Sequence, residues 1–373
     1  MFEGVNGLRE CYAGETVVFE NCVFTGSTYG AHFDGGENDI IFKNCTFSGF
    51  NAFGAAVTML TFDGCKFVAN GKSGYNGANL WGSTKMINTE FTFDGTASTE
   101  WVDIRGASTK SYSFNGCTVC GEPMPIETIG VYTSDNMNDE VDITFNGVTY
   151  ENYKTATFIS TAEELFAFAN EVNVNNNTFK GKTVYLMADI DLANKAWTPV
   201  GQTGATQFQG TFNGQGKTIS NLNIDATAQT GAHYSSGLFG WLNAATVKNV
   251  NIAGATVKGN HNVGVIAGYL ETAGCTIEAC HVTGAAVECH NANADANGDK
   301  CGVIVGNAPN AGTPVKDCTA ADSTVSAGRD AGQIAGAAKE ANVTGCSATN
   351  VTVTANGEGT GANISNEVIG RIL

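Results

Sequence analysis

The chain has 373 residues and a net charge of −17, from 36 acidic and 19 basic side chains. This balance argues against a nucleic-acid partner, because phosphate binding needs a concentrated basic surface. No apolar run is long enough to insert into a membrane, and no signal peptide is visible at the start of the chain. Abundant glycine (47) with scarce proline (5) favours short strands and tight turns over helical bundles.

A six-residue pattern recurs through the first part of the chain. Its first and last positions are apolar, its third is Asn or Gly, and its fourth is most often Cys. The copies are 19–24 (FENCVF), 42–47 (FKNCTF), 62–67 (FDGCKF), 86–91 (MINTEF), 114–119 (FNGCTV) and 145–150 (FNGVTY). A unit of this length cannot close a core alone, but stacked copies can. We therefore expect an all-β parallel β-helix in which each repeat forms one coil of two or three strands.

A break in the pattern follows residue 150 and contains a predicted helix over residues 160–173. Ser160 or Thr161 can cap it, with Glu163 or Glu164 completing a capping box. One face carries the apolar stripe Leu165, Phe168, Ala169 and Val172. We expect this helix to cover the first coil of a second solenoid. The preferred organisation is two stacked modules, 1–155 and 156–373, and the alternative is one continuous rod with a helical excursion.

The second module repeats the six-residue pattern and adds a glycine-rich one. The added copies are 236–240 (SGLFG), 263–268 (VGVIAG), 301–306 (CGVIVG) and 331–336 (AGQIAG). Cysteine takes the fourth position of the six-residue pattern at 22, 45, 65, 117, 280, 318 and 346. Because equivalent side chains of stacked coils line up, we expect a ladder of small buried thiols that serve packing rather than chemistry.

These residues resemble known families. The Phe-x-Asn-Cys-x-Phe coils look like right-handed parallel β-helix proteins of the pectate-lyase-like class. Residues 157–350 are similar to GLUG-repeat proteins of bacterial cell surfaces. The similarity lies in the glycine-rich copies and in three segments: 184–192 (VYLMADIDL), 197–201 (WTPVG) and 208–219 (FQGTFNGQGKTI). The resemblance implies a surface or secreted β-helix, often within a larger adhesin-like protein. It does not imply a catalytic site.

The best candidate site lies in residues 100–105 (EWVDIR). Alternation in a strand places Trp101, Asp103 and Arg105 on one face, where an aromatic ring, a carboxylate and a guanidinium suit a sugar. Tyr75 and Trp81 lie in turn-like sequence and are further ligand-binding candidates. Some β-helix proteins are polysaccharide lyases or glycoside hydrolases, so Asp103, Arg105 and Glu100 are also weak catalytic candidates.

Two acidic turns are candidate calcium sites, the only cofactor that the sequence suggests. Asp34 and Asp39 flank the first turn. Asp295, Asn297 and Asp299 in the second turn resemble the start of a calcium loop. Ile304 stands where an EF-hand needs its bidentate Glu, so a complete EF-hand is excluded.

These observations favour a non-enzymatic, adhesin-like module at the cell surface or outside the cell, with a glycan or a host or surface protein as its partner. Two alternatives stay open. One is a polysaccharide-active lyase or hydrolase that uses the first module. The other is a phage or virion fibre or tailspike component that self-associates into a fibre or trimer.

Overall fold

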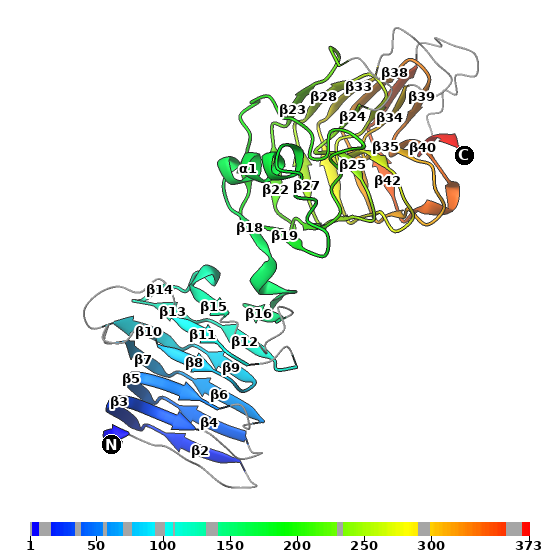
Figure 1. The fold of residues 1–373 in the computed structure, drawn as a ribbon. Helices are drawn as coiled ribbons and strands as arrows, with labels where there is room; N and C mark the ends of the chain where they lie inside the picture. Colours follow the sequence, from blue (N-terminus) through cyan, green and yellow to red (C-terminus); the bar gives the residue numbers. More distant parts are fainter. Residues whose placement is uncertain are drawn as a thin grey trace. The chain divides into compact units, whose positions relative to one another are not determined.

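The computed structural model describes residues 2–6, 16–33, 39–54, 58–69, 77–93, 101–106, 109–131, 141–229, 234–289, 299–355 and 368–373. The described chain is all-β apart from one α-helix and the short 3-10 helices η1 (Ile126–Thr128), η2 (Tyr153–Thr155) and η3 (Glu340–Asn342). Strands of successive coils pair in parallel, so the fold is the expected parallel β-helix (Figure 1). The chain forms two compact units, Met1–Ala156 and Thr157–Leu373.

The first unit is built from two sheets. One contains β2 (Val17–Glu20), β4 (Asp39–Lys43), β6 (Met59–Asp63), β9 (Thr84–Ile87), β12 (Tyr112–Asn115), β16 (Ile143–Phe145) and β17 (Val148–Tyr150). The other contains β1 (Phe2–Asn6), β3 (Val23–Phe33), β5 (Thr46–Phe53), β7 (Lys66–Ala69), β8 (Ala78–Leu80), β10 (Glu90–Phe93), β11 (Val102–Ile104), β13 (Thr118–Val119), β14 (Glu122–Pro123) and β15 (Ile129–Val131). Among these described strands only two pairs are antiparallel: β13 with β14, and β16 with β17. A coil here has two or three strands, as the repeat predicts.

The third position of the six-residue pattern forms the corner between the two sheets. Its φ angle is positive in each of the first unit's copies: Asn21 (56°), Asn44 (50°), Gly64 (61°), Asn88 (47°), Gly116 (63°) and Asn146 (47°). Glycine and asparagine adopt this left-handed conformation most readily. The requirement for a sharp corner therefore explains why the repeat uses these two residues there.

Phenylalanine side chains from successive coils stack to fill the core of the first unit. One column contains Phe19, Phe42 and Phe62, and the other contains Phe24, Phe47, Phe67 and Phe91. Ring centroids of consecutive members are 4.8–5.2 Å apart. This separation is close to the spacing of neighbouring strands, about 4.8 Å, so in-register pairing itself places the rings in contact.

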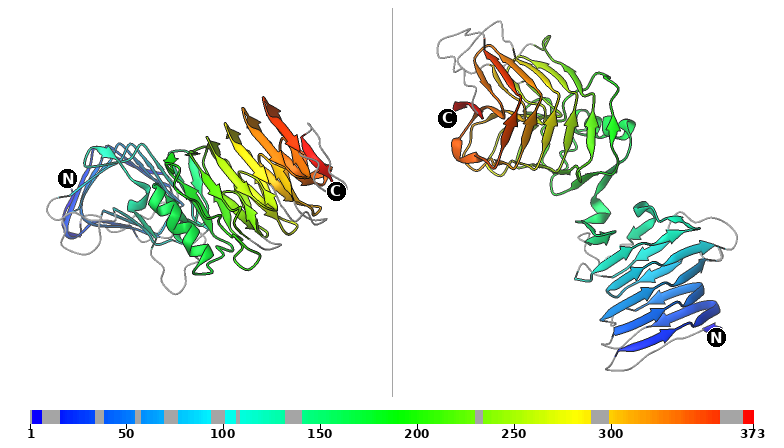
Figure 2. Two further views of the ribbon diagram at one scale, coloured as in Figure 1. Left: turned by 90° about the horizontal axis from the view of Figure 1, so that it is seen from above. Right: turned by 180° about the vertical axis from the view of Figure 1, so that it is seen from behind.

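The α-helix α1 (Ala162–Asn173) follows the first strand of the second unit. Thr161 caps it, and its side chain and that of Glu164 form the reciprocal capping box that the sequence predicts. The four stripe residues Leu165, Phe168, Ala169 and Val172 are all buried. Phe168 packs against Phe179, Phe208, Phe212 and Phe239, so α1 covers the first coil (Figure 2).

Five sheets run along the second unit. The first contains β18 (Thr157–Ile159), β19 (Thr183–Leu186), β21 (Thr211–Asn213), β26 (Thr246–Lys248), β31 (Thr276–Glu278), β36 (Val315–Lys316) and β41 (Val343–Thr344). The second contains β20 (Ile190–Asp191), β22 (Thr218–Ser220), β27 (Asn251–Ala253), β32 (His281–Thr283), β37 (Thr319–Ala321) and β42 (Ser347–Thr349). The third contains β23 (Asn223–Asp225), β28 (Thr256–Gly259), β33 (Ala286–Cys289), β38 (Thr324–Ala327) and β43 (Thr352–Ala355).

The glycine-rich pattern forms the other two sheets. The fourth contains β24 (Ser235–Ser236), β29 (Asn262–Val263), β34 (Lys300–Gly302) and β39 (Asp330–Gly332). The fifth contains β25 (Phe239–Leu242), β30 (Ala267–Leu270), β35 (Val305–Ala308), β40 (Ala335–Ala338) and β44 (Ile369–Ile372). A complete coil of this unit therefore has five short strands, and the expectation of two or three is wrong here.

Close backbone contact explains the glycines between these two sheets. A Cβ atom added to Gly268 would lie 2.7 Å from the carbonyl oxygen of Asn262, and one added to Gly264 would lie 2.7 Å from the amide nitrogen of Gly306. Real side chains do not approach that closely. The pattern thus marks places where neighbouring strands touch through backbone atoms, which requires residues without a side chain.

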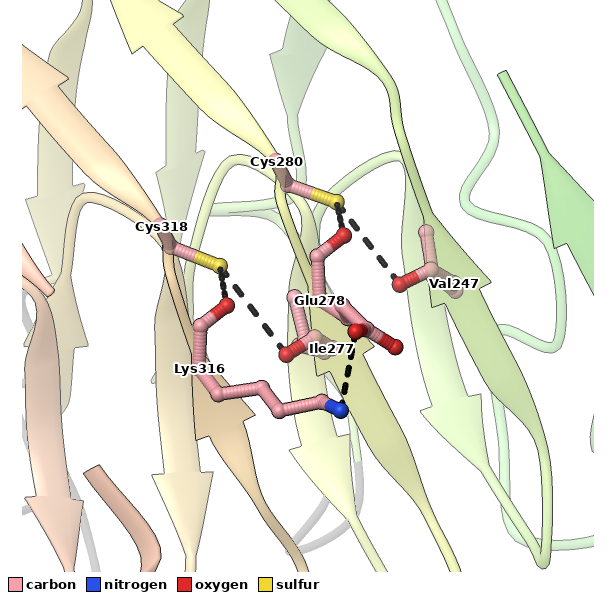
Figure 3. Close-up of polar contacts among 6 residues, drawn as sticks. All are labelled: Val247, Ile277, Glu278, Cys280, Lys316 and Cys318. Atoms are coloured by element: carbon pink, nitrogen blue, oxygen red, sulfur yellow. Dashed lines mark hydrogen bonds and ion pairs between the residues drawn. The ribbon is translucent and has the colours of Figure 1, made fainter. Parts of the chain in front are cut away.

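The thiols of the fourth position point inward and form the expected column. The Cys280 thiol lies 3.7 Å from the carbonyl oxygen of Val247 in the preceding coil and 3.4 Å from that of Glu278 (Figure 3). Cys318 repeats this arrangement one coil later with Ile277 and Lys316. No disulfide forms among the described cysteines. These thiols donate to backbone oxygens at the corner and fill the core, which is the packing role that the repeat predicts.

Candidate functional site

The candidate site lies on the outer face of the first unit, where two neighbouring coils present polar and aromatic residues. Register pairs Asn79 of β8 with Asp103 of β11. Ala78 and Leu80 of β8 are fully buried in the core, so Asn79 faces outward by alternation. Trp81 and Arg105 directly follow these strands on the same face. Two pairs of residues from neighbouring coils, Asn79 with Trp81 and Asp103 with Arg105, thus form a two-by-two array, which we call the Arg105 array.

An ion pair holds Arg105 in place. Its Nε and Nη2 atoms donate to Oδ2 of Asp103 at 2.8 and 2.5 Å. The guanidinium carbon lies 5.5 Å from the centroid of the Trp81 ring, within range of a cation–π contact. The side chains of Arg105 and Asp103 are 15% and 17% exposed. Both charged groups are therefore oriented by neighbours while part of each still faces solvent.

Asn79 forms the buried floor of the array. Its side chain is 0% exposed, and its Nδ2 donates to the carbonyl oxygen of Asn51 at 3.1 Å. Its Oδ1 has no hydrogen-bond partner among the described residues. The sequence prediction missed Asn79, because it lies 24 residues before Asp103. Only the strand register, which follows from the spacing of the repeat, could have predicted that Asn79 and Asp103 are neighbours.

One member of the predicted cluster is almost fully buried. Trp101 is 4% exposed, so its ring offers almost no surface to a ligand, whereas the Asp103 and Arg105 side chains stay partly exposed. Trp81 takes its place as the aromatic member. Glu100 and Tyr75 lie outside the described residues.

One residue of each candidate calcium turn lies in the part of the chain that the structure describes. Asp39 is the exposed first residue of β4. Asp299 is 0% exposed, and its Oδ1 lies 3.8 Å from the Cys289 thiol. Asp34, Asp295 and Asn297 lie outside the described residues. Among the residues with described positions, no three His, Cys, Asp or Glu side chains gather as potential metal ligands.

The comparisons with known proteins give one partial similarity. No protein family matches this chain. The chain is similar to Halomucin from Haloquadratum walsbyi, with 34% identity over 104 residues. This similarity covers 25% of the present chain and 1% of Halomucin. Within the described residues, no helix combines the length and the apolar character needed to span a membrane.

Proposed function

We propose that this chain is a non-enzymatic, extracellular or cell-surface β-helix that binds glycans through the Arg105 array. The observation that carries the proposal is the pairing of Arg105 with Asp103 on an outer face beside Trp81. The partial similarity to Halomucin is compatible with a surface location. The resemblance of residues 157–350 to GLUG-repeat surface proteins supports the same location.

The chemistry of the array suits a polyhydroxylated ligand. A guanidinium donates to sugar oxygens and a carboxylate accepts from sugar hydroxyls, while the face of an aromatic ring stacks on the apolar face of a sugar ring. The ion pair fixes both groups before the ligand arrives, which lowers the entropy cost of binding. Asp103 lies in strand β11 and Arg105 directly follows it, so both charged groups are anchored at a solenoid sheet, where positions are held more rigidly than in a loop.

A glycan array probed with the full-length chain tests this proposal. The array would carry plant, microbial and mucin-type glycans, and each hit would be measured by titration calorimetry. We expect Arg105→Ala to weaken binding at least about tenfold, which corresponds to about 1.4 kcal/mol. The matched control is Lys316→Ala, which removes a 2.8 Å ion pair with Glu278 on the outer face of the second unit.

Three outcomes would contradict the proposal. The first is a wild-type chain that binds no glycan on the array. The second is equal loss of affinity in Arg105→Ala and in the Lys316→Ala control. The third is release of oligosaccharides from a soluble polysaccharide that Asp103→Ala abolishes, because this result would assign the array to a lyase or hydrolase.

A further inference from the structure

A column of four residues runs along the outside of the fifth sheet of the second unit. Register places one residue from each of four coils in it: Trp241, Tyr269, Asn307 and Ala337. The next residue on each strand, such as Leu242, Leu270 or Ala308, belongs to the hydrophobic core. Because side chains alternate along a strand, the column lies on the opposite side of the sheet from that core.

Two aromatic rings lie at one end of the column. The ring centroids of Trp241 and Tyr269 are 4.5 Å apart, with an angle of 54° between the ring planes. Trp241 is 7% exposed, whereas Tyr269 is half-buried. Trp241 therefore supports the ring of Tyr269, and Tyr269 is the ring that reaches the surface.

A carboxylate is held beside this ring by a relay of amides. Glu271 lies two residues beyond Tyr269 and accepts a hydrogen bond from the Gln207 amide. Gln207 in turn accepts from Asn243 at 2.6 Å, and Asn243 accepts from the Thr272 hydroxyl at 2.9 Å. Burial and the charge of Glu271 raise the pKa of Tyr269 above its ordinary value.

Asn307 supplies an acceptor next to Tyr269. Its side chain is 7% exposed, and its Oδ1 has no hydrogen-bond partner among the residues with described positions. Leaving a buried carbonyl oxygen without a donor costs free energy. A ligand that brings a hydroxyl or amide hydrogen to this oxygen would recover that free energy on binding.

We propose that Tyr269, Glu271 and Asn307, supported by Trp241, form a second carbohydrate-binding site, which we call the Tyr269 face. An aromatic ring flanked by two hydrogen-bond acceptors suits a neutral sugar, which offers an apolar face and several hydroxyl donors. The carboxylate of Glu271 disfavours uronates and sulfated sugars through like-charge repulsion. The inference rests on the proposed function for the ligand class, but its residues belong to a different unit.

Titration calorimetry of the full-length chain tests the Tyr269 face. The probes are neutral hexasaccharides of glucose, xylose and mannose, with oligogalacturonate as the acidic comparison. All variants are made in an Arg105→Ala background, which removes the first proposed site. Tyr269→Ala removes the ring, Tyr269→Phe keeps it, and Asn307→Ala removes the acceptor. The control is His281→Ala, an exposed residue of β32 on another sheet. Circular dichroism and thermal unfolding show whether each variant is folded.

We expect at least one neutral hexasaccharide to bind the Arg105→Ala chain. Tyr269→Ala and Asn307→Ala should each weaken this binding at least about tenfold, while Tyr269→Phe and His281→Ala change it less than about twofold. Loss of all binding in Arg105→Ala alone would overturn the second site and leave the first. A wild-type chain that binds no probe, or binds oligogalacturonate more tightly than the neutral sugars, would overturn the Tyr269 face. The glycan array decides the first site separately.

Discussion

Replacing one phenylalanine in the middle of the first unit's core should destabilise that unit far more than replacing one at the end of the column. Phe47 and Phe91 belong to the same column, and both are 0% exposed. Phe91 packs against the ring of Phe67, whereas Phe47 packs against the rings of Phe24, Phe42, Phe53, Phe62 and Phe67. The two sites therefore lose the same atoms but different ring contacts when mutated to alanine.

The size of the difference follows from the ring contacts. Phe→Ala in a core costs about 3–5 kcal/mol through lost burial and the cavity that remains. Each aromatic pair contributes about 0.5–1.5 kcal/mol beyond burial. Even at the lower value, Phe47→Ala should reduce the free energy of unfolding by about 2 kcal/mol more than Phe91→Ala.

Urea unfolding of the full-length chain measures both values. Trp81 and Trp101 both lie in the first unit, so their fluorescence reports its unfolding. The second unit contains Trp197 and Trp241, and replacing these two by phenylalanine in all variants isolates the signal. Equal destabilisation by Phe47→Ala and Phe91→Ala would refute the reasoning, because burial alone would then determine the cost.

Three further outcomes are expected. The free energy of unfolding should be about 1 kcal/mol higher for Cys318→Thr than for Cys318→Ala. Thr89 takes the equivalent position in its own coil, and its hydroxyl makes the same corner hydrogen bonds. Chemical denaturation of the two variants measures the difference. Thr161→Ala should cost the second unit about 1 kcal/mol by removing the helix cap, as measured in the same way. Burial raises the pKa of Cys65 to about 12, and a hydrogen bond with Cys280 and burial raise that of Cys318 to about 12, both from 9.0. Because the folded-state pKa is the higher one, the stability from these thiols is present below about pH 9 and is lost toward pH 12, so the urea midpoint should fall across this range.

The sequence was sufficient to predict the features that each coil repeats. Asn44 and Gly64 occupy the left-handed corner, and Cys65 points into the core behind it. The capping box of Thr161 and Glu164 also follows from local sequence, because both partners lie in one helical turn. These features depend on contacts within a coil or between equivalent residues of adjacent coils, and the repeat determines both.

Other features depend on contacts that the repeat pattern does not contain. The extra strands of the second unit form because Gly264 and Gly268 let backbones touch, and this contact is with residues of other strands. Trp101 is buried although strand alternation groups it with Asp103 and Arg105. Asn79 became part of the candidate site through register alone. Local periodicity cannot determine any of these three outcomes.

The register of a solenoid separates the residues that maintain the fold from those that are available for binding. Inward positions must match their equivalents in the next coil, so they produce the visible repeat. Outward positions have no such requirement, and Tyr269 and Asn307 are neighbours although 38 residues separate them. A binding surface on this fold therefore combines residues of adjacent coils, and no single continuous motif contains all of it. The Arg105 array and the Tyr269 face both have this form, which explains why neither could be recognised in full from the sequence.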